Sequence, residues 1–227
     1  MTELAQHTTE YGVVESEPPE QLARNLNAAG HLLASATAFF FLAFVFAYFY
    51  LRSLNNAGLW HPKHVDPSQT LGALVMAAGV LTAVLVRWGL ADHRAERRPA
   101  WRVKGAVALA FGIAAVVLQV VEWTTVGFGP ADGGYASVFF GWTGFYVVFL
   151  VGALFWLETV LATSIRWGRV PAPAPFAPGE ATGDADRPGR DIADPLSLVH
   201  AALDALSFYW GFLAGVGVLA WILLYLA

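Results

Sequence analysis

Long apolar stretches alternate with short polar segments along the whole chain. A helix needs about 20 predominantly apolar residues to cross a hydrocarbon core about 30 Å thick, because lipid satisfies no backbone hydrogen bond. Stretches that meet this requirement predict an all-α fold, a polytopic membrane protein with five transmembrane helices. The predicted spans are residues 30–51, 70–90, 103–125, 135–163 and 203–226. The fourth is long enough to tilt or to protrude from the bilayer.

Two polar segments lie outside these spans. Residues 1–29 are acidic and lack the basic start, apolar middle and small-residue cleavage site of a secretory signal. We therefore expect a retained, mostly disordered cytoplasmic tail, with a helix near residues 19–27 as the alternative. Residues 167–195 are rich in Pro, Gly and Asp and cannot build a core, so we expect a disordered cytoplasmic loop.

The basic residues indicate the orientation of the helices, because Lys and Arg accumulate in cytoplasmic loops. Of the 13 Lys and Arg residues, only Arg52 and Lys63 lie on the side opposite the N-terminus. This asymmetry predicts an N-in, C-out protein, and an even number of spans would mix the two groups. The residues on the N-terminal side are Arg24, Arg87, Arg94, Arg97, Arg98, Arg102, Lys104, Arg166, Arg169, Arg187 and Arg190.

Composition excludes several kinds of function. Hydrophobic residues make up 57% of the chain and charged residues 13%, against roughly 25% charged residues in soluble domains. The absence of cysteine excludes thiolate zinc sites, Fe–S clusters and dithiol redox chemistry. A net charge of −4 offers no basic surface for nucleic acid, so no nucleic-acid partner is expected.

None of the 6 histidines lies deep in a predicted span, whereas a haem-binding membrane protein needs facing buried ligands. His61 and His64 have the residue type of a metal site but no third ligand, and Pro62 between them opposes a helical pair. We therefore expect no catalytic, cofactor-binding or metal-binding residue in this chain.

Polar residues inside the predicted spans are better candidates, because a carboxylate in lipid costs at least about 2.5 kcal/mol. Gln119 and Glu122 share one face of the third span. They either hydrogen-bond neighbouring helices or contact a lipid headgroup, a proton or a partner subunit, and both interpretations stay open.

A second group of polar residues lies near the N-terminal side of the membrane. Glu158 is expected to pair with Arg166 or another cation of that side, and Asp204 is likewise expected to pair with a cation there. His200 and Asp204 are one helical turn apart, which allows a hydrogen bond between them.

Small residues at helical spacing predict close helix contacts, at Gly211 with Gly215 and among Gly141, Gly144 and Gly152. The aromatic first span faces either the other helices or a partner subunit, and the sequence does not choose between them.

Several segments, in order along the chain, carry a family resemblance. The third span has a glycine, a glutamine and a glutamate followed by an aromatic residue, namely Gly112, Gln119, Glu122 and Trp123. The chain thereby resembles subunit III of the haem-copper oxygen reductases in its five-helix form, over about residues 29–227. The other matching segments are residues 34–40, 46–52, 60–62, 68–70, 135–144, 208–210 and 224–226.

Departures from that family limit what the resemblance implies. Ala36 stands where members usually carry a glutamate, and Tyr146 and Phe149 stand where histidines are common. The last span has Gly211 and Ala214 in place of its usual pattern. Roles attributed to those family residues are therefore not transferred to this chain.

The resemblance implies a non-catalytic accessory subunit of a respiratory terminal oxidase, in the inner (plasma) membrane of a prokaryotic cell. Such a subunit packs on subunit I, with subunit II in the same complex, holds structural phospholipid and supports proton uptake and stability. Haem and copper are expected in the partner subunits of this proton-pumping complex, which reduces oxygen to water. The alternatives are an accessory protein of a nitric oxide reductase and a free-standing proton-coupled carrier.

Overall fold

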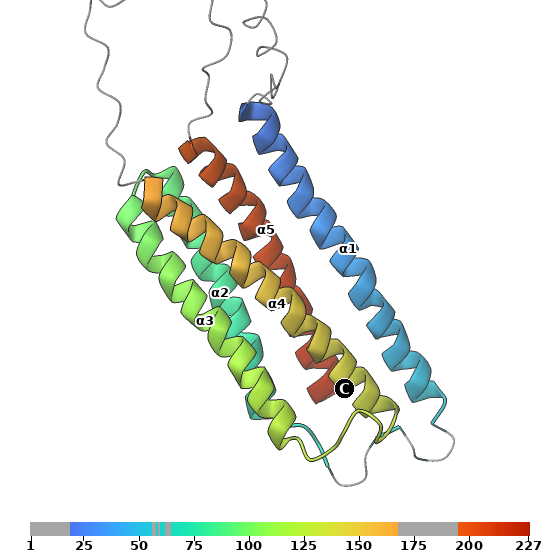
Figure 1. The fold of residues 1–227 in the computed structure, drawn as a ribbon. Helices are drawn as coiled ribbons and strands as arrows, with labels where there is room; N and C mark the ends of the chain where they lie inside the picture. Colours follow the sequence, from blue (N-terminus) through green and yellow to red (C-terminus); the bar gives the residue numbers. More distant parts are fainter. Residues whose placement is uncertain (1–18, 56–57, 59, 62–64, 168–194) are drawn as a thin grey trace, which may run out of the picture.

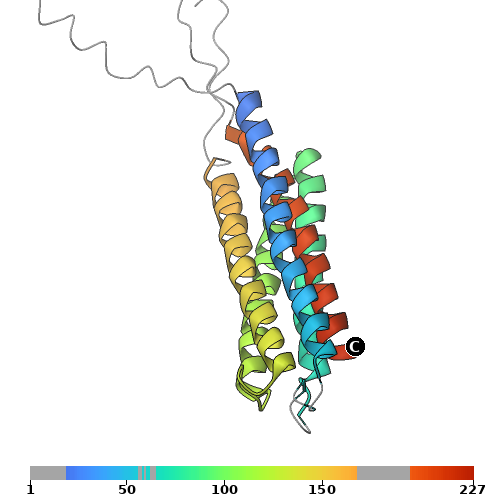
Figure 2. The same cartoon turned by 90° about the vertical axis from the view of Figure 1, so that its right-hand side faces the viewer.

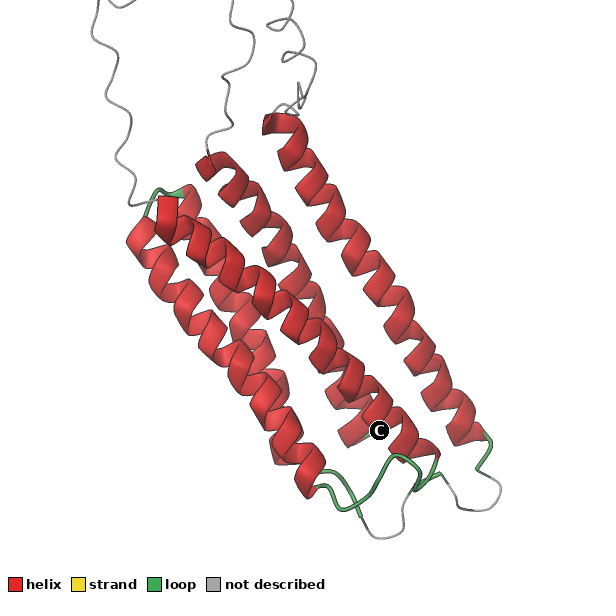
Figure 3. Ribbon diagram, viewed as in Figure 1, coloured by secondary structure: helices red, strands yellow, loops and turns green. Residues whose placement is uncertain are grey.

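Five long helices build the protein in a computed structural model that describes residues 19–55, 58, 60–61, 65–167 and 195–227. They are α1 (Pro19–Ser53), α2 (Gln69–Arg94), α3 (Arg98–Thr125), α4 (Gly134–Trp167) and α5 (Pro195–Trp221), and α5 continues into a π-helix at Ile222–Leu226. Each of the five is long and apolar enough to cross a membrane, and the described residues contain no strand (Figure 3). The predicted all-α fold with five spans is confirmed.

All five helices begin before the residue that the apolar pattern predicts, and the difference is largest for α1 and α5. α1 begins at Pro19 and runs through residues 19–29, which the sequence assigned to the tail, so the helical alternative for this segment is the one observed. α5 begins at Pro195, before residue 203. Proline is favoured at the first position of a helix, because its fixed φ suits the helix and its missing N–H would be unpaired there. The rest of the predicted tail and loop lies outside the described residues.

The helices form a closed ring in the spatial order α1, α5, α2, α3, α4, and α4 also contacts α5 across it. Figures 1 and 2 show the helices running side by side in alternating directions. We call the end with the α2–α3 turn the basic end, because Arg94, Arg97 and Arg98 lie there. The π-helix and the C-terminus lie at the opposite end (Figure 1).

Aromatic side chains fill much of the ring's interior. Trp101, Trp142 and Trp210 are fully buried. Phe41 of α1 packs against Trp142 of α4, with ring centroids 5.7 Å apart. The other side of α1 is exposed, with Phe39 76% and Phe46 68% accessible. One face of the aromatic first helix thus packs against the other helices of the chain, and the opposite face stays exposed.

A buried polar network as candidate functional site

Gln119 and Glu122 are both buried on α3, with 2% and 0% of their surface exposed. Gln119 Nε2 donates a hydrogen bond to Glu122 Oε2 over 2.8 Å. Tyr225 OH donates to the same oxygen over 2.7 Å, although Tyr225 lies 103 residues further along the chain. The Glu122 carboxylate therefore joins α3 to the π-helix, at the end of the bundle opposite the basic end.

Packing and further hydrogen bonds hold Tyr225 in place. Gln69 Nε2, at the start of α2, donates to the Tyr225 carbonyl over 3.1 Å. Gly72 lies one turn further along α2, and a Cβ there would run into the Tyr225 ring. Tyr135 OH of α4 donates to the carbonyl of Leu224. The C-terminal residues are thus tied to α2, α3 and α4.

Trp123 extends the network to α4. Its Nε1 donates to Thr143 Oγ1 over 2.9 Å, and that hydroxyl donates in turn to the Phe139 carbonyl over 2.7 Å. Glu122, which accepts from Gln119, therefore binds Tyr225 of the C-terminal segment, and Trp123 binds α4.

A small void adjoins this network. A void of about 20 Å³ lies beside Gln119 and Tyr225 and is also lined by Trp142 and Trp221, which is room for one water molecule. Glu122 Oε1 is buried without a hydrogen-bond partner among the described residues. A carboxyl group placed in this way can link helices, and it can also exchange a proton with water. The geometry is compatible with both.

A larger cavity, of about 800 Å³, opens at the same end of the bundle. Its walls include Arg52 of α1, Trp60 of the first connection, Gln69 of α2 and the C-terminal Ala227. The connection between α1 and α2 therefore lies next to the residues that hold Tyr225.

Asp204 lies near the basic end, where it pairs with Arg94 instead of His200. Arg94 Nη2 of α2 donates to Asp204 Oδ1 over 2.9 Å. The His200 ring lies edge-on to His93, with centroids 5.7 Å apart. The hydrogen bond that one-turn spacing allows between His200 and Asp204 is thus not formed among the described residues, because the cation from α2 takes the carboxylate.

Glu158 is exposed on α4, and no ion pair to it occurs within the described part of the chain. The expected pairing with Arg166 is wrong for a geometric reason. Arg166 lies about 12 Å further along the helix axis, at about 1.5 Å per residue, and not one turn away.

Histidines take part in packing and polar contacts. The His31 ring stacks on Phe208 of α5 with centroids 4.1 Å apart, and His61 Nε2 lies 3.5 Å from Asp66 Oδ1. His64, the other half of the pair weighed as a metal site, lies outside the described residues. Over the part of the chain that is described, no group of three or more His, Cys, Asp or Glu residues is placed to hold a metal ion.

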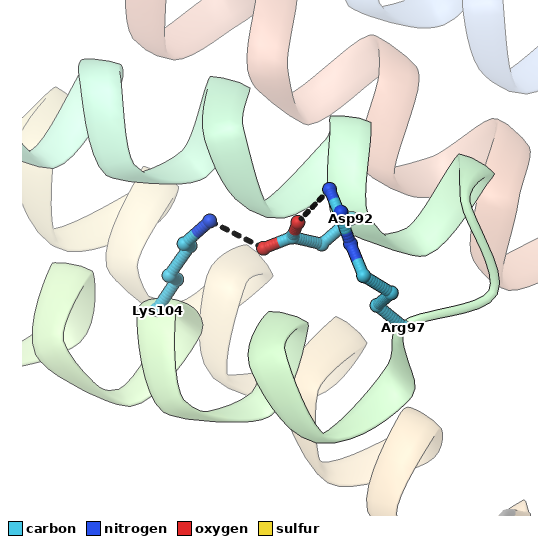
Figure 4. Close-up of polar contacts among 3 residues, drawn as sticks. All are labelled: Asp92, Arg97 and Lys104. Carbon is cyan, nitrogen blue, oxygen red and sulfur yellow. Dashed lines mark hydrogen bonds and ion pairs between the residues drawn. The ribbon is translucent and has the colours of Figure 1, made fainter.

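The sequence analysis missed Asp92, whose surface is only 3% exposed. Arg97 Nη2 donates to Asp92 Oδ1 over 2.7 Å, and Lys104 Nζ donates to Oδ2 (Figure 4). Asp92 lies on α2, Arg97 in the α2–α3 turn and Lys104 on α3, so one carboxylate clamps the hairpin. An acidic residue in the most basic stretch of the chain, where Glu96 is the other, was the available signal.

We expect Asp92→Leu to lower the free energy of unfolding by about 2 kcal/mol. This value lies between the small contribution of an exposed ion pair and the ~3–5 kcal/mol lost when a buried pair is broken, since both cations are partly solvated. Asp204→Leu is the matched control, because its pair with Arg94 is more exposed, and it should cost about 0.5 kcal/mol. Thermal unfolding in detergent, followed by tryptophan fluorescence, measures both. Equal losses would contradict the clamp.

Of the five glycines for which the sequence predicts close helix contacts, Gly141 alone makes one among the described residues. A Cβ there would lie 2.7 Å from the Phe44 ring of α1, whereas a Cβ on Gly144, Gly152, Gly211 or Gly215 would meet nothing within 4 Å. These four glycines therefore leave open faces on α4 and α5. Tyr146, which stands at a family histidine position, is buried and donates to the Leu213 carbonyl of α5 over 3.2 Å.

Comparisons with known proteins agree on one family. The family model described as "Cytochrome c oxidase subunit III" matches residues 12–167. The protein named cytochrome c oxidase subunit 3 from Cyprinus carpio is 31% identical over 159 residues, which are 66% of this chain and 59% of the relative. The protein of that name from Struthio camelus is 27% identical over 141 residues, with 60% and 54% covered. The one from Gallus gallus is 25% identical over 203 residues, with 86% and 66% covered. The chain spans less than two thirds of the length of these relatives.

Proposed function

This chain belongs to the cytochrome c oxidase subunit III family, and from that premise we propose that it is the accessory subunit III of a respiratory terminal oxidase. In this proposal it packs on the haem-copper subunit I, with subunit II in the same complex, and haem and copper belong to those partners. The family match over residues 12–167 is the observation that carries the proposal. The open apolar faces on the outside of the ring, such as the exposed face of α1, suit contact with lipid chains or with a neighbouring transmembrane helix.

We propose that the complex lies in the cell's inner (plasma) membrane with the basic end of this chain in the cytoplasm. The clustering of Arg94, Arg97, Arg98 and Arg102 at one end of the ring supports this orientation, because basic residues accumulate on the cytoplasmic side. Arg52 lies at the other end, where its Nη1 donates to Tyr48 OH over 3.0 Å.

A structural phospholipid is part of the proposal. A groove of about 650 Å³ runs between α2 and α5, lined by Trp88 and Phe208 with Arg87 toward the basic end. A guanidinium binds a phosphate oxygen pair well, and tryptophan favours headgroup depth, so the groove suits one phospholipid of the adjacent leaflet. The open face at Gly211 lies in the same groove.

The carrier alternative has little support in the geometry. Glu122 lies toward the end opposite to Asp204 and is enclosed by Gln119 and Tyr225, while Asp204 is paired with Arg94. Glu158 contacts neither of these groups among the described residues. The three carboxylates therefore form no continuous proton path within the described part of this chain.

Deletion of the chain tests the accessory role. A complex purified without it should keep its haem content and its initial rate of oxygen reduction, because the redox centres lie in other subunits. It should lose activity faster during sustained turnover, since proton uptake and lipid contacts are no longer supported. Adding the chain back should restore the durability. Loss of haem on deletion, or unchanged durability, would contradict the proposal. If the partner subunits reduce nitric oxide in place of oxygen, the alternative of a nitric oxide reductase complex is favoured.

A further inference from the structure

Glu158 carries a carboxylate on the outside of the ring, within the apolar part of α4. Its neighbours on that face are Val148, Val151 and Phe155, which are 62%, 50% and 70% exposed. Trp101 Nε1 donates to Ser164 Oγ further along α4, near the basic end. Glu158 lies about 9 Å from that contact toward the middle of the membrane, at about 1.5 Å per residue.

Within the described part of the chain, no basic side chain pairs with Glu158. Arg166 is too distant along the helix axis, and Arg102 Nη2 donates to the Ser164 carbonyl. The hydroxyl of Thr159, the adjacent exposed residue, donates to the Phe155 carbonyl of its own helix. A carboxylate is costly in hydrocarbon, and a short glutamate side chain cannot extend to the membrane surface as lysine does. A compensating group therefore lies outside the described residues.

The shape of the same face fits a second helix. Gly152 lies beside Val151, and a Cβ on it would meet nothing within 4 Å. Ala162, one turn beyond Glu158, is also exposed. Small residues next to a large one, here Phe155, let the backbone of another transmembrane helix approach closely, which lipid chains do not require.

We propose that this face, formed by Val148, Val151, Gly152, Phe155, Glu158 and Ala162, docks a transmembrane helix of a partner polypeptide that presents an arginine or lysine to Glu158. The inference rests on the proposed function as a subunit of a membrane complex, and it adds the contact surface and the chemistry of the partner. An ion pair shielded from water by the two helices fixes their register, because a shift along the axis would leave both charges unpaired.

A photo-reactive phenylalanine analogue in place of Phe155 tests which molecule covers the face. We expect that irradiation of intact native membranes yields a protein adduct whose cross-linked peptide belongs to a transmembrane segment with an Arg or Lys. Adducts with lipid only, or with a second copy of this chain, would overturn the inference. If only those adducts form but a haem-bearing subunit still co-purifies, the docking inference fails while the proposed function stands. If no haem-bearing subunit co-purifies, the proposed function itself fails.

Charge reversal tests the pairing itself. Glu158→Lys should reduce the Phe155 adduct by about tenfold or more, because it places two cations together in the interface. Leu81→Lys on α2 is the matched control, because Leu81 also lies within a membrane span. Its neighbour Thr82 hydrogen-bonds the Ala108 carbonyl in the middle part of α3, which places Leu81 at a similar depth. The adduct yield of Leu81→Lys should stay within about twofold of the wild-type yield. Changing the partner's cation to glutamate should restore the adduct of Glu158→Lys. An adduct yield that Glu158→Lys leaves unchanged would contradict the proposal.

Discussion

Replacing Glu122 by leucine is expected to lower the free energy of unfolding by about 3 kcal/mol and to release the C-terminal residues from α3. The substitution removes the acceptor of both Gln119 Nε2 and Tyr225 OH. Each polar group left unpaired in the interior costs about 1–3 kcal/mol, whereas a hydrogen bond within a membrane protein contributes about 0.6–1.7 kcal/mol. Thermal unfolding in detergent measures the loss, and Val120→Leu on the exposed side of α3 should change little.

Glu122→Gln separates the two interpretations that the sequence leaves open for this residue. The amide keeps an acceptor oxygen for Tyr225 but cannot exchange a proton, so stability should fall by only about 1 kcal/mol. If Glu122 only joins helices, oxygen reduction by the assembled complex is as durable during sustained turnover as in the wild type. If it handles protons, activity is lost faster during sustained turnover while stability is largely kept. A stability loss in Glu122→Leu no larger than that of Val120→Leu would contradict the network itself.

Gly89→Leu is expected to disrupt the meeting point of α2, α3 and α4. A Cβ on Gly89 would already lie 2.5 Å from the ring of Trp101, which is fully buried. Leucine must therefore displace Trp101 and break its 3.0 Å hydrogen bond to Ser164. Overpacking costs about 1–3 kcal/mol, and the lost hydrogen bond adds about 1 kcal/mol, so we expect a loss of about 3 kcal/mol.

Gly215→Leu is the control for that change, because a Cβ there meets nothing within 4 Å and the residue is exposed. It gains helix propensity by up to about 1 kcal/mol, so the isolated chain should be unchanged or slightly more stable. Thermal unfolding of the two variants, with near-ultraviolet circular dichroism of the tryptophans, provides the comparison. A Gly89→Leu protein as stable as Gly215→Leu would show that Trp101 does not pack as described.

Local features of the sequence predict the spans and part of the site. Apolar length alone identifies the five membrane-crossing helices, because the requirement for internal backbone hydrogen bonds is local. The shared face of Gln119 and Glu122 follows from helical periodicity. Their hydrogen bond in the structure agrees with that arrangement. The family match supports the subunit III resemblance that these residues carried.

Contacts between segments that lie far apart along the chain could not be predicted from the sequence. Tyr225 reaches Glu122 across 103 residues, and no periodicity links the two. Asp92 lies beyond the predicted span 70–90, so the sequence places it in a loop. In the structure α2 continues to Arg94, and Asp92 is buried. The same limitation applies to Asp204, because the sequence favours a cation of the basic end as its partner but does not identify Arg94, which approaches it from another helix.

The central claim, that this chain is a subunit of a haem-bearing oxidase, is tested most directly by purifying it from native membranes in a mild detergent. The composition and the reduced-minus-oxidised absorption spectrum of the purified material are then recorded. The account predicts co-purification of a haem-copper subunit I in a fixed ratio, with haem bands in the spectrum and oxygen reduction by the preparation. Recovery of the chain without any haem-bearing subunit would contradict it.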